Sequence, residues 1–531
     1  MMNKTPKLGI VIAVFIVVFV TSAFGALISY APNLDLTQIV SDPYYLHVTK
    51  FSFYQAFLST LLSVGLAIPV AHSLSRRDFM GKSFLLKLFS STLVLPVLVG
   101  VFGLLAIYGN SGLLATWLNK WNVELPFSIY GLNGILLAHV FFNLPYASRL
   151  LLLSLEGIPP EQHKLCSYLG MSHWYKFKWV EWPRLRQQLP HVCGLVFMLC
   201  FTSFATVMAL GGGPKSTTIE LAIYQAIKFD FDLQAGALLA IWQMLLCGLL
   251  SLSIQKISKP NNLAMQSNRH PIFFTKDNNR AKLWDCSWIA FASFIVLPPL
   301  MMVVLSGLNS KLWQVLQDDR FWQAVKASLS IACSASVIAL FIGVAILQTS
   351  RIWRSKGRSN YANGIELIGT IILVTPGLVI STGLFLLLRK ITDVYSLAFI
   401  IVVAVNSLMA LPYVIKTLSQ PFFQILQQYQ FLTMSLGMKG WRRFLLIEWR
   451  GLQKPIAQAF AISFMLSMGD LSAIALFGSQ DFRTLPLYLF QLLGSYQMEA
   501  AAVVSLTLLL LSVGSFTLVE KVFGKTYAPR R

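Results

Sequence analysis

An acidic side chain, Asp470, stands inside an otherwise apolar run that covers residues 456–478. A carboxylate is costly within a membrane segment and commonly marks a path for ions or protons, so Asp470 could attract a positively charged solute or carry a proton. The neighbouring Gly469, Ser467 and Ser472 could equally mark a position of close helix packing or a kink. Both interpretations of Asp470 stay open on the sequence.

Two stretches rich in cations and tryptophan suit the binding of a partner. They read KLCSYLGMSHWYKFKWVEWPR at residues 164–184 and FLTMSLGMKGWRRFLLIEWR at residues 431–450. Before the first, Pro159 and Pro160 suit the start of a helix, and Gly170 is placed to end that helix in a left-handed conformation. The residues with the spacing of one helical face are Leu165, Tyr168 and Leu169.

Local chemistry predicts that a second short helix follows this glycine. Ser172 is a good N-cap, so the helix is expected to run from Ser172 to Trp182 and to stop at Pro183. A surface hairpin of this kind could bind lipid headgroups alone. Lipid contact requires no glycine at a fixed position, so the matching Gly170 and Gly437 favour a site where a protein docks.

The two stretches belong to an internal repeat. The tripeptide LPY occurs at 144–146 and 411–413, and LGM occurs at 169–171 and 436–438, so both pairs lie 267 residues apart. A series of matches in one register predicts a duplicated bundle of six spans. The residues that this offset also aligns are Trp174 with Trp441, Phe177 with Phe444, Glu181 with Glu448, Trp182 with Trp449 and Ser203 with Asp470.

Composition indicates the fold class that must position these residues. Hydrophobic residues make up 56% of the chain and charged residues 12%, against roughly 25% charged residues in ordinary soluble domains. Apolar runs of about 20 residues suffice for a membrane-spanning helix, and lipid leaves helices as the default spanning structure. The spans we predict are 8–30, 52–74, 86–108, 131–155, 190–211, 234–254, 285–306, 323–348, 365–388, 394–416, 456–478 and 498–519.

The sequence therefore predicts an all-α polytopic membrane protein of about twelve spans. Its expected parts are a first repeat at 1–255, a cytoplasmic linker at 256–283 and a second repeat at 284–531. The span at 8–30 is longer than the apolar region of an ordinary signal peptide, so we interpret it as an uncleaved anchor. The six cysteines, which include no CxxC pair, are expected to be small buried apolar side chains.

Lysine and arginine collect in alternate loops, which predicts the orientation of the chain. The positive-inside rule then places both termini and both tryptophan-rich stretches in the cytoplasm. Because six is even, the two repeats run in the same direction, related by an axis along the membrane normal. The net charge of +21 is spread over loops beside membrane helices, so we expect membrane lipid and no nucleic acid as a partner.

Both tryptophan-rich stretches resemble the cytoplasmic EAA loop of binding-protein-dependent ABC importer permeases. Gly170 and Gly437 match the glycine of that loop, whereas Pro183 in the first copy is replaced by Arg450 in the second. The EAA positions themselves differ from the family pattern. The resemblance implies that two ATPase-coupling loops are formed by Lys164, Leu165, Cys166, Leu169, Gly170 and Phe177 and by Phe431, Leu432, Thr433, Leu436, Gly437 and Phe444.

The resemblance extends over essentially the whole chain, with the stretches LGGGPKSTTIELAIYQAI at 210–227 and GDLSAIALFGSQDFRTLPLYLFQLLGSY at 469–496. Together with the tandem fusion they are similar to the thiamine ABC importer permeases of Gram-negative bacteria. That family implies a multi-pass subunit of the inner membrane that moves thiamine and its phosphates by alternating access. It also implies a periplasmic thiamine-binding protein and two copies of a cytoplasmic ATPase as partners.

The chain contains no Walker-type GxxxxGK[ST] stretch, so ATP and Mg²⁺ are expected on the partner ATPase and no cofactor on this chain. It is therefore expected not to be an enzyme, and its Asp470 is a candidate for the translocation path. Two alternatives remain: the fused ferric-iron importer permeases share this architecture, and secondary transporters also use parallel six-helix halves. Secondary transporters commonly need several intramembrane carboxylates, of which this sequence offers few.

Overall fold

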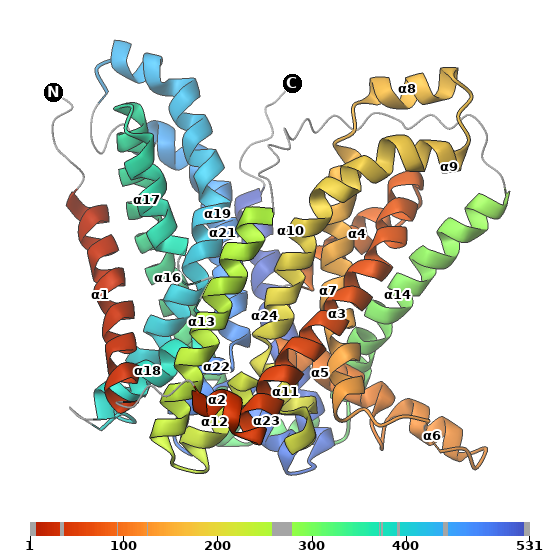
Figure 1. Cartoon of the computed structure of the whole chain (residues 1–531), viewed down its shortest axis with the longest axis vertical. Helices are drawn as coiled ribbons and strands as arrows, with labels where there is room; N and C mark the ends of the chain where they lie inside the picture. The colour runs from red at the N-terminus through yellow and green to blue at the C-terminus, as the bar shows by residue number, and fades with distance from the viewer. Residues whose placement is uncertain are drawn as a thin grey trace.

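The computed structural model describes residues 7–31, 37–92, 94–124, 126–257, 279–370, 372, 375–389, 393–438 and 444–524. Within these residues the regular structure is helical throughout, with no β-strand, which confirms the all-α membrane architecture (Figure 1). Most of the predicted linker at 256–283 lies outside the described residues.

The first half of the chain contains one long helix for most predicted spans and several shorter helices between them. Its elements are α1 (Lys7–Tyr30), α2 (Thr37–Ser41), α3 (Pro43–Arg76), α4 (Lys82–Ser91), α5 (Val97–Tyr108), α6 (Leu113–Asn119), α7 (Leu132–Glu156), α8 (Pro160–Tyr168), α9 (His173–Lys176), the π-helix η1 (Phe177–Glu181), α10 (Trp182–Phe201), α11 (Phe204–Leu210), the 3-10 helix η2 (Pro214–Ser216), α12 (Ile219–Lys228) and α13 (Leu233–Ile257).

The second half follows the same order of elements. They are α14 (Asn279–Gly307), α15 (Leu312–Leu316), α16 (Asp319–Ser355), α17 (Ser359–Thr370), α18 (Gly377–Arg389), α19 (Ala398–Ser435), the π-helix η4 (Phe444–Trp449), α21 (Arg450–Gly469), α22 (Ser472–Phe477), α23 (Leu485–Gly494) and α24 (Met498–Gly524). Even single hydrogen bonds recur, because the Ile219 N–H donates to Ser52 Oγ over 3.0 Å and the Leu485 N–H donates to Ser328 Oγ over 2.7 Å.

The number of unbroken spans is smaller than the twelve that the sequence predicts. Within the described residues, ten helices are long and apolar enough to cross a membrane. An eleventh span is obtained if the helical segment His173–Phe201 and α11, which are bent by 52° relative to each other, are counted as one. The predicted span at 365–388 is divided between α17 and α18, and the one at 86–108 between α4 and α5. Pro376 and Pro96 stand directly before α18 and α5, and proline lacks the N–H that would continue a helix.

The first helix of each half packs against the other half. Helix α1 contacts α16, α17 and α18, as well as α13, and α14 contacts α3, α5 and α7, as well as α24. The contacts are close: a Cβ on Gly383 of α18 would lie 2.5 Å from the Ala23 carbonyl oxygen of α1. Small residues permit such approaches between membrane helices. The predicted parts 1–255 and 284–531 therefore describe the order along the chain, while their first helices are exchanged in space.

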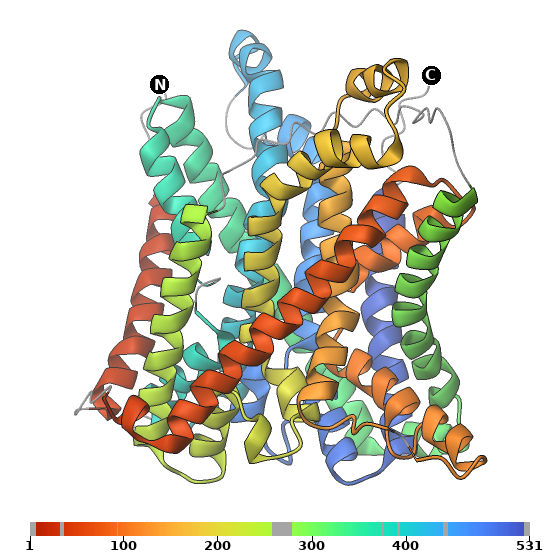
Figure 2. The same cartoon turned by 45° about the vertical axis from the view of Figure 1, so that its right-hand side comes forward.

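The two tryptophan-rich stretches lie at one end of the molecule, which we call the basic end. Figures 1 and 2 both show α8 and the C-terminal end of α19 at this end, on opposite sides of it. Helices α12 and α23 lie at the opposite end of the bundle (Figure 1). This matches the alternation of cations along the sequence, because Arg76 and Lys176 also belong to the basic end.

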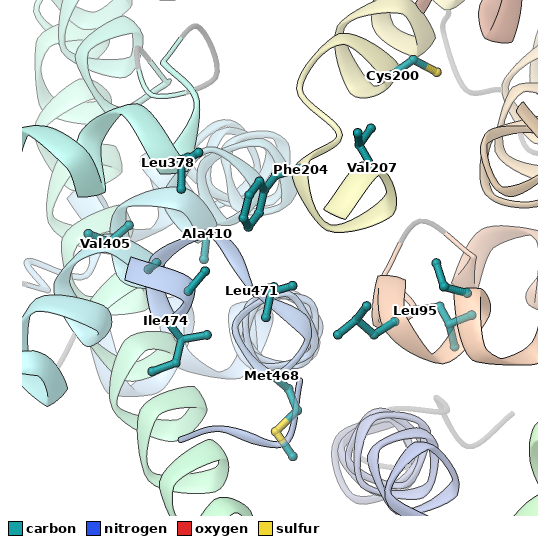
Figure 3. Close-up of a cluster of buried hydrophobic side chains, with 14 of the residues drawn as sticks. Leu95, Cys200, Phe204, Val207, Leu378, Val405, Ala410, Met468, Leu471 and Ile474 are labelled. Carbon is teal, nitrogen blue, oxygen red and sulfur yellow. The ribbon is translucent and has the colours of Figure 1, made fainter. Parts of the chain in front are cut away.

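Apolar side chains from both halves meet at the centre of the bundle. Figure 3 shows Phe204 of α11 near Leu378 and Leu471 of the second half, with Ile474 further away in the same cluster. All four side chains are buried, with exposed fractions of 4% or less. The two halves are therefore joined here through a hydrophobic contact.

The cysteines are only partly buried, in contrast to the prediction for all six. Cys193 is half-buried. The lipid around a membrane helix is as apolar as a protein core, so a small apolar side chain such as cysteine can also lie on the outer surface of the bundle. The fully buried ones are Cys166, Cys200 and Cys247, and the exposed ones are Cys286 and Cys333.

Candidate coupling surface and translocation path

The first helix of the hairpin at residues 160–182 ends as its sequence predicts. Gly170 follows α8 with a φ of 62°, in the left-handed region. The Met171 N–H donates to the Cys166 carbonyl over 3.0 Å, and the Gly170 N–H donates to the Ser167 carbonyl over 3.1 Å. These two bonds form a Schellman motif, which ends the helix and satisfies its last carbonyl groups.

The second hairpin repeats this helix end but not the helix start. Gly437 has a φ of 59°, and the Met438 N–H donates to the Thr433 carbonyl over 3.0 Å. The repeat predicts a separate helix here, as in the first half, whereas α19 continues without a break to Ser435. The first half has Pro159 and Pro160 at the start of α8, and the second half has no proline at the aligned positions. Phe444 begins η4, and its side chain lies outside the described part of the structure.

Aligned residues of the two hairpins have the same surroundings. Leu165 and Leu432 are 57% and 49% exposed, whereas Cys166 and Thr433 are 6% and 2% exposed. The other predicted coupling residues at these helix ends are exposed, and they are Lys164, Leu169, Phe431 and Leu436. Two helix ends thus present apolar side chains to the outside at the same end of the molecule, which is unusual for a surface in contact with water.

The second arm of the first hairpin is longer than predicted. Ser172 caps α9 as expected, because its side chain accepts a hydrogen bond from the Tyr175 N–H. The prediction that Pro183 stops the helix is wrong, since α9, η1 and α10 follow one another without interruption from His173 to Phe201. The π-turn bond from the Trp182 N–H to the Phe177 carbonyl widens the helix just before the proline, and proline is tolerated in the first turn of the next helix.

A groove of about 400 Å³ opens between α8 and this second arm. The predicted coupling residues Leu165, Cys166 and Leu169 line one side, and Trp179 and Pro183 line the other. The groove is thus an apolar depression on the basic end, suited to receive side chains of a partner protein.

The other face of this arm is fixed to α3 by an aromatic and ionic cluster. The Phe177 ring lies 6.0 Å from the Trp174 ring and 5.0 Å from the His72 ring, measured between centroids. The Glu181 carboxylate, 4% exposed, lies 2.9 Å from His72 Nε2 and 3.4 Å from Lys176 Nζ. Phe177 is therefore half-buried behind the hairpin, and its ring and the Glu181 carboxylate join this arm to α3.

The same end of α3 is joined to the second half through a buried acid. Asp285 of α14 is fully buried, and its carboxylate lies 2.7 Å from Arg77 Nε and 3.6 Å from Arg76 Nε. No sequence motif singles out Asp285, which stands at the start of a predicted span. Its role is visible only in the packing of α14 on α3, which places it beside two arginines.

Asp470 lies at the break between α21 and α22. Its Oδ1 accepts hydrogen bonds from the Ser472 Oγ over 2.7 Å and from the Ser472 N–H over 3.3 Å, and its Oδ2 accepts one from the Ala473 N–H over 3.2 Å. A Cβ on the preceding Gly469 would lie 2.9 Å from the Pro96 Cα. Asp470 thus stabilises a kink at a close contact between the halves.

The first half has the same break but places its acid elsewhere. Ser203, aligned with Asp470, lies between α10 and α11. A carboxylate from another helix, Glu220 of α12, is hydrogen-bonded to the backbone of Phe204 at the start of α11. Glu220 is 3% exposed, and burial, together with the charge of Asp470, raises its pKa to about 8. The sequence pattern does not indicate Glu220, because it stands in a stretch that reads as a polar connection.

Comparisons with known proteins agree with these features. The chain is 46% identical to the thiamine transport system permease protein ThiP of Escherichia coli over 520 residues, which cover 97% of this chain and 96% of the relative. The proteins of the same name are 42% identical in Haemophilus influenzae, over 95% of this chain and 93% of the relative, and 38% identical in Brucella abortus, over 90% and 88%. No protein-family model matches the chain.

Proposed function

Because the chain belongs to the family of thiamine transport system permease proteins, we propose that it is the membrane subunit of an ATP-driven importer for thiamine and its phosphates. The observation that carries the ATP-driven part is the pair of apolar helix ends, each closed by a left-handed glycine, at one end of the bundle. A secondary transporter would have no use for two matched docking surfaces.

The geometry suggests how two ATPase subunits would act on the bundle. Each would receive one helix end, α8 or the end of α19, in a surface groove, and their closure on ATP would draw the two helix ends together. The second arm of the first hairpin is joined to α3 by the ion pair of Glu181 with His72, and the end of α3 is joined to α14 by the ion pair of Arg77 with Asp285. The halves would then rock as rigid bodies, and the apolar contact around Phe204 would open and close between them.

In this proposal the basic end faces the cytoplasm of a bacterial cell, the protein lies in the inner membrane, and both termini are cytoplasmic. A periplasmic thiamine-binding protein would dock at the opposite end, on the segments at 213–233 and 479–497. ATP and Mg²⁺ would bind the ATPase alone, and the permease would catalyse no reaction.

The choice of substrate is tested by the soluble protein that activates the complex. We expect thiamine-loaded binding protein to stimulate ATP hydrolysis by the permease and ATPase reconstituted in lipid vesicles, and to support uptake of labelled thiamine. Stimulation by a ferric-binding protein, with none by the thiamine-binding protein, would instead assign the chain to ferric-iron import.

A single permease chain is expected to recruit two identical ATPase subunits, because it carries both hairpins. Native mass spectrometry of the detergent-purified complex should give a mass of one permease and two ATPases. A complex with two permease chains for each ATPase pair would contradict this arrangement.

Replacing Asp470 with asparagine is expected to reduce thiamine uptake several-fold without preventing assembly. Thiamine carries a positive charge, and the variant loses the negative charge while keeping one oxygen that can accept from Ser472. Uptake into vesicles would be compared with the amount of ATPase that copurifies with the permease. Normal uptake by the variant would remove Asp470 from the path and leave it a role in the kink alone.

A further inference from the structure

We propose that Glu220 and Asp470 together form a binding site for an organic cation at the junction of the two halves, where the positively charged ring of the transported molecule is held. The inference rests on the proposed function, since it assigns a site to the cargo of the importer. It adds a residue and a geometry that neither the sequence pattern nor the names of the relatives supply.

The two carboxylates come from different halves and act on each other. Glu220 belongs to α12 of the first half, and Asp470 lies between α21 and α22 of the second. They are close enough for the charge of Asp470 to oppose ionisation of Glu220. Two ionised carboxylates that interact in this way repel each other, so Glu220 gives up its proton most readily when a positive charge lies between them and attracts both.

The position of Glu220 is tied to the second half by the other end of its own helix. Lys228, at the end of α12, donates to the carbonyl groups of Leu476 and Gly478, each over 3.3 Å. Those carbonyls stand at the end of α22, whereas Asp470 stands at its start. Helix α12 therefore lies along α22 with Glu220 toward the Asp470 end, so the pair forms only while the two halves are in contact here.

A buried side-chain amide without a hydrogen-bond partner in the described part of the chain, that of Gln243, lies opposite Glu220. Gln243 of α13 is fully buried, and among the described residues neither its side-chain oxygen nor its side-chain nitrogen has a hydrogen-bond partner. Helices α12 and α13 form an antiparallel hairpin in which a Cβ on Gly236 would lie 2.7 Å from Ile227. Glu220 lies seven residues, or about two turns, before Ile227, and Gln243 lies seven residues after Gly236. Because the two helices are antiparallel, Glu220 and Gln243 are then opposite each other on the faces that pack together.

Two further observations support this placement of Gln243. Cys247, one turn further along α13, lies within the electrostatic influence of Glu220. A buried amide without any partner is uncommon in a folded protein and calls for a ligand or an opposing polar group. A carboxylate and an amide that face each other can hold a cation that carries both a charge and a hydrogen-bonding group.

Helix α18 adds a third polar surface beside Asp470. A Cβ on Gly377 would lie 2.9 Å from the Ser472 Oγ, which itself donates to Asp470. Ser381 is one turn beyond Gly377 on the same face of α18, is fully buried, and has a side-chain oxygen without a partner in the part of the chain that the structure describes. Unpartnered polar atoms thus approach the two carboxylates from α13 and from α18.

The alternative role of Glu220 is structural, because it binds the backbone of Phe204 at the start of α11. The variant Glu220→Gln separates the two roles, since glutamine keeps an oxygen that can accept this hydrogen bond but carries no charge. Glu220→Asp keeps the charge with a shorter side chain. Glu156→Gln is a matched control, because Glu156 is exposed at the basic end, 4.0 Å from Arg149.

The test is equilibrium binding to the purified complex of permease and ATPase, without the binding protein. Two labelled probes are compared: thiamine, and an uncharged analogue in which carbon replaces the ring nitrogen that bears the positive charge. We expect the wild type and Glu156→Gln to bind thiamine at least tenfold more tightly than the analogue. Glu220→Gln should lose this preference through weaker binding of thiamine alone, and Glu220→Asp should retain most of it.

Other outcomes would overturn the site. One is that Glu220→Gln weakens the binding of both probes equally. The others are that this variant keeps the preference for thiamine, or that the wild type binds the two probes with the same affinity. Failure of the proposed function looks different: the wild-type permease, with its ATPase and thiamine-binding protein in vesicles, would then take up no thiamine at all.

Discussion

Valine in place of Gly170 or Gly437 is expected to abolish thiamine uptake while the protein still inserts in the membrane. Both glycines have a φ near +60°, where a side chain adds about 1 kcal/mol or more of backbone strain, and a β-branched side chain adds more. An added Cβ meets no described atom within 4 Å at either position, so no clash with these neighbours contributes. The strain is relieved by re-aiming α8 or the end of α19, which would uncouple the ATPase.

The measurement is uptake at matched amounts of membrane protein, together with ATP hydrolysis and ATPase retention. Gly357 provides a control, because it lies between α16 and α17 with a φ of 75° and also has open space around an added Cβ. Gly357→Val introduces comparable strain outside the two hairpins, so its uptake should remain near normal. Near-normal uptake by the Gly170 and Gly437 variants would mean that the hairpins bind only lipid.

Asp285→Ala is expected to destabilise the protein by about 3–5 kcal/mol, the usual cost of removing one partner from a buried ion pair. Asp285 is fully buried beside Arg76 and Arg77, so the variant leaves their charges without this carboxylate. Asp285→Asn should be destabilised less, because the amide can still accept a hydrogen bond from Arg77. The measurement is thermal unfolding of the detergent-solubilised protein, followed by its helical circular dichroism signal.

The surface pair of Arg149 and Glu156, 4.0 Å apart, gives the comparison for this experiment. A surface ion pair contributes about 0–1 kcal/mol, so Glu156→Ala should shift the unfolding temperature much less than Asp285→Ala. Equal shifts in the two variants would show that the contact between α3 and α14 does not depend on the buried acid.

The helix ends at Gly170 and Gly437 could be predicted from sequence because the signal is local. A Schellman end needs a glycine and a few neighbouring residues, and both are visible in the LGM tripeptides. The helix at Ser172 is predictable for the same reason. The continuity of α19 could be inferred too, because the second copy lacks the two prolines that stand at the start of α8 in the first copy.

Features that depend on contacts between distant helices were not predictable in this way. Glu220 stands in a stretch with glycine, lysine and threonine, and its burial arises from the packing of α11, α13 and α22 around α12. The division of two predicted spans into shorter helices was missed for a related reason. Hydropathy alone does not show that Pro96 and Pro376 divide apolar runs, because the freed backbone groups must be satisfied by neighbouring helices.

The exchange of α1 and α14 between the halves affects how the protein is made. The principal neighbours of α1 are α16, α17 and α18, which leave the ribosome only after the whole first half and the linker. At roughly 5–20 residues per second, α1 spends tens of seconds in the bilayer before most of its final surface exists. Its sequence suits a helix that is stable alone in lipid, because its most apolar 18 residues have a mean hydropathy of 2.8, the highest among the described spans, and residues 8–30 include no charged side chain.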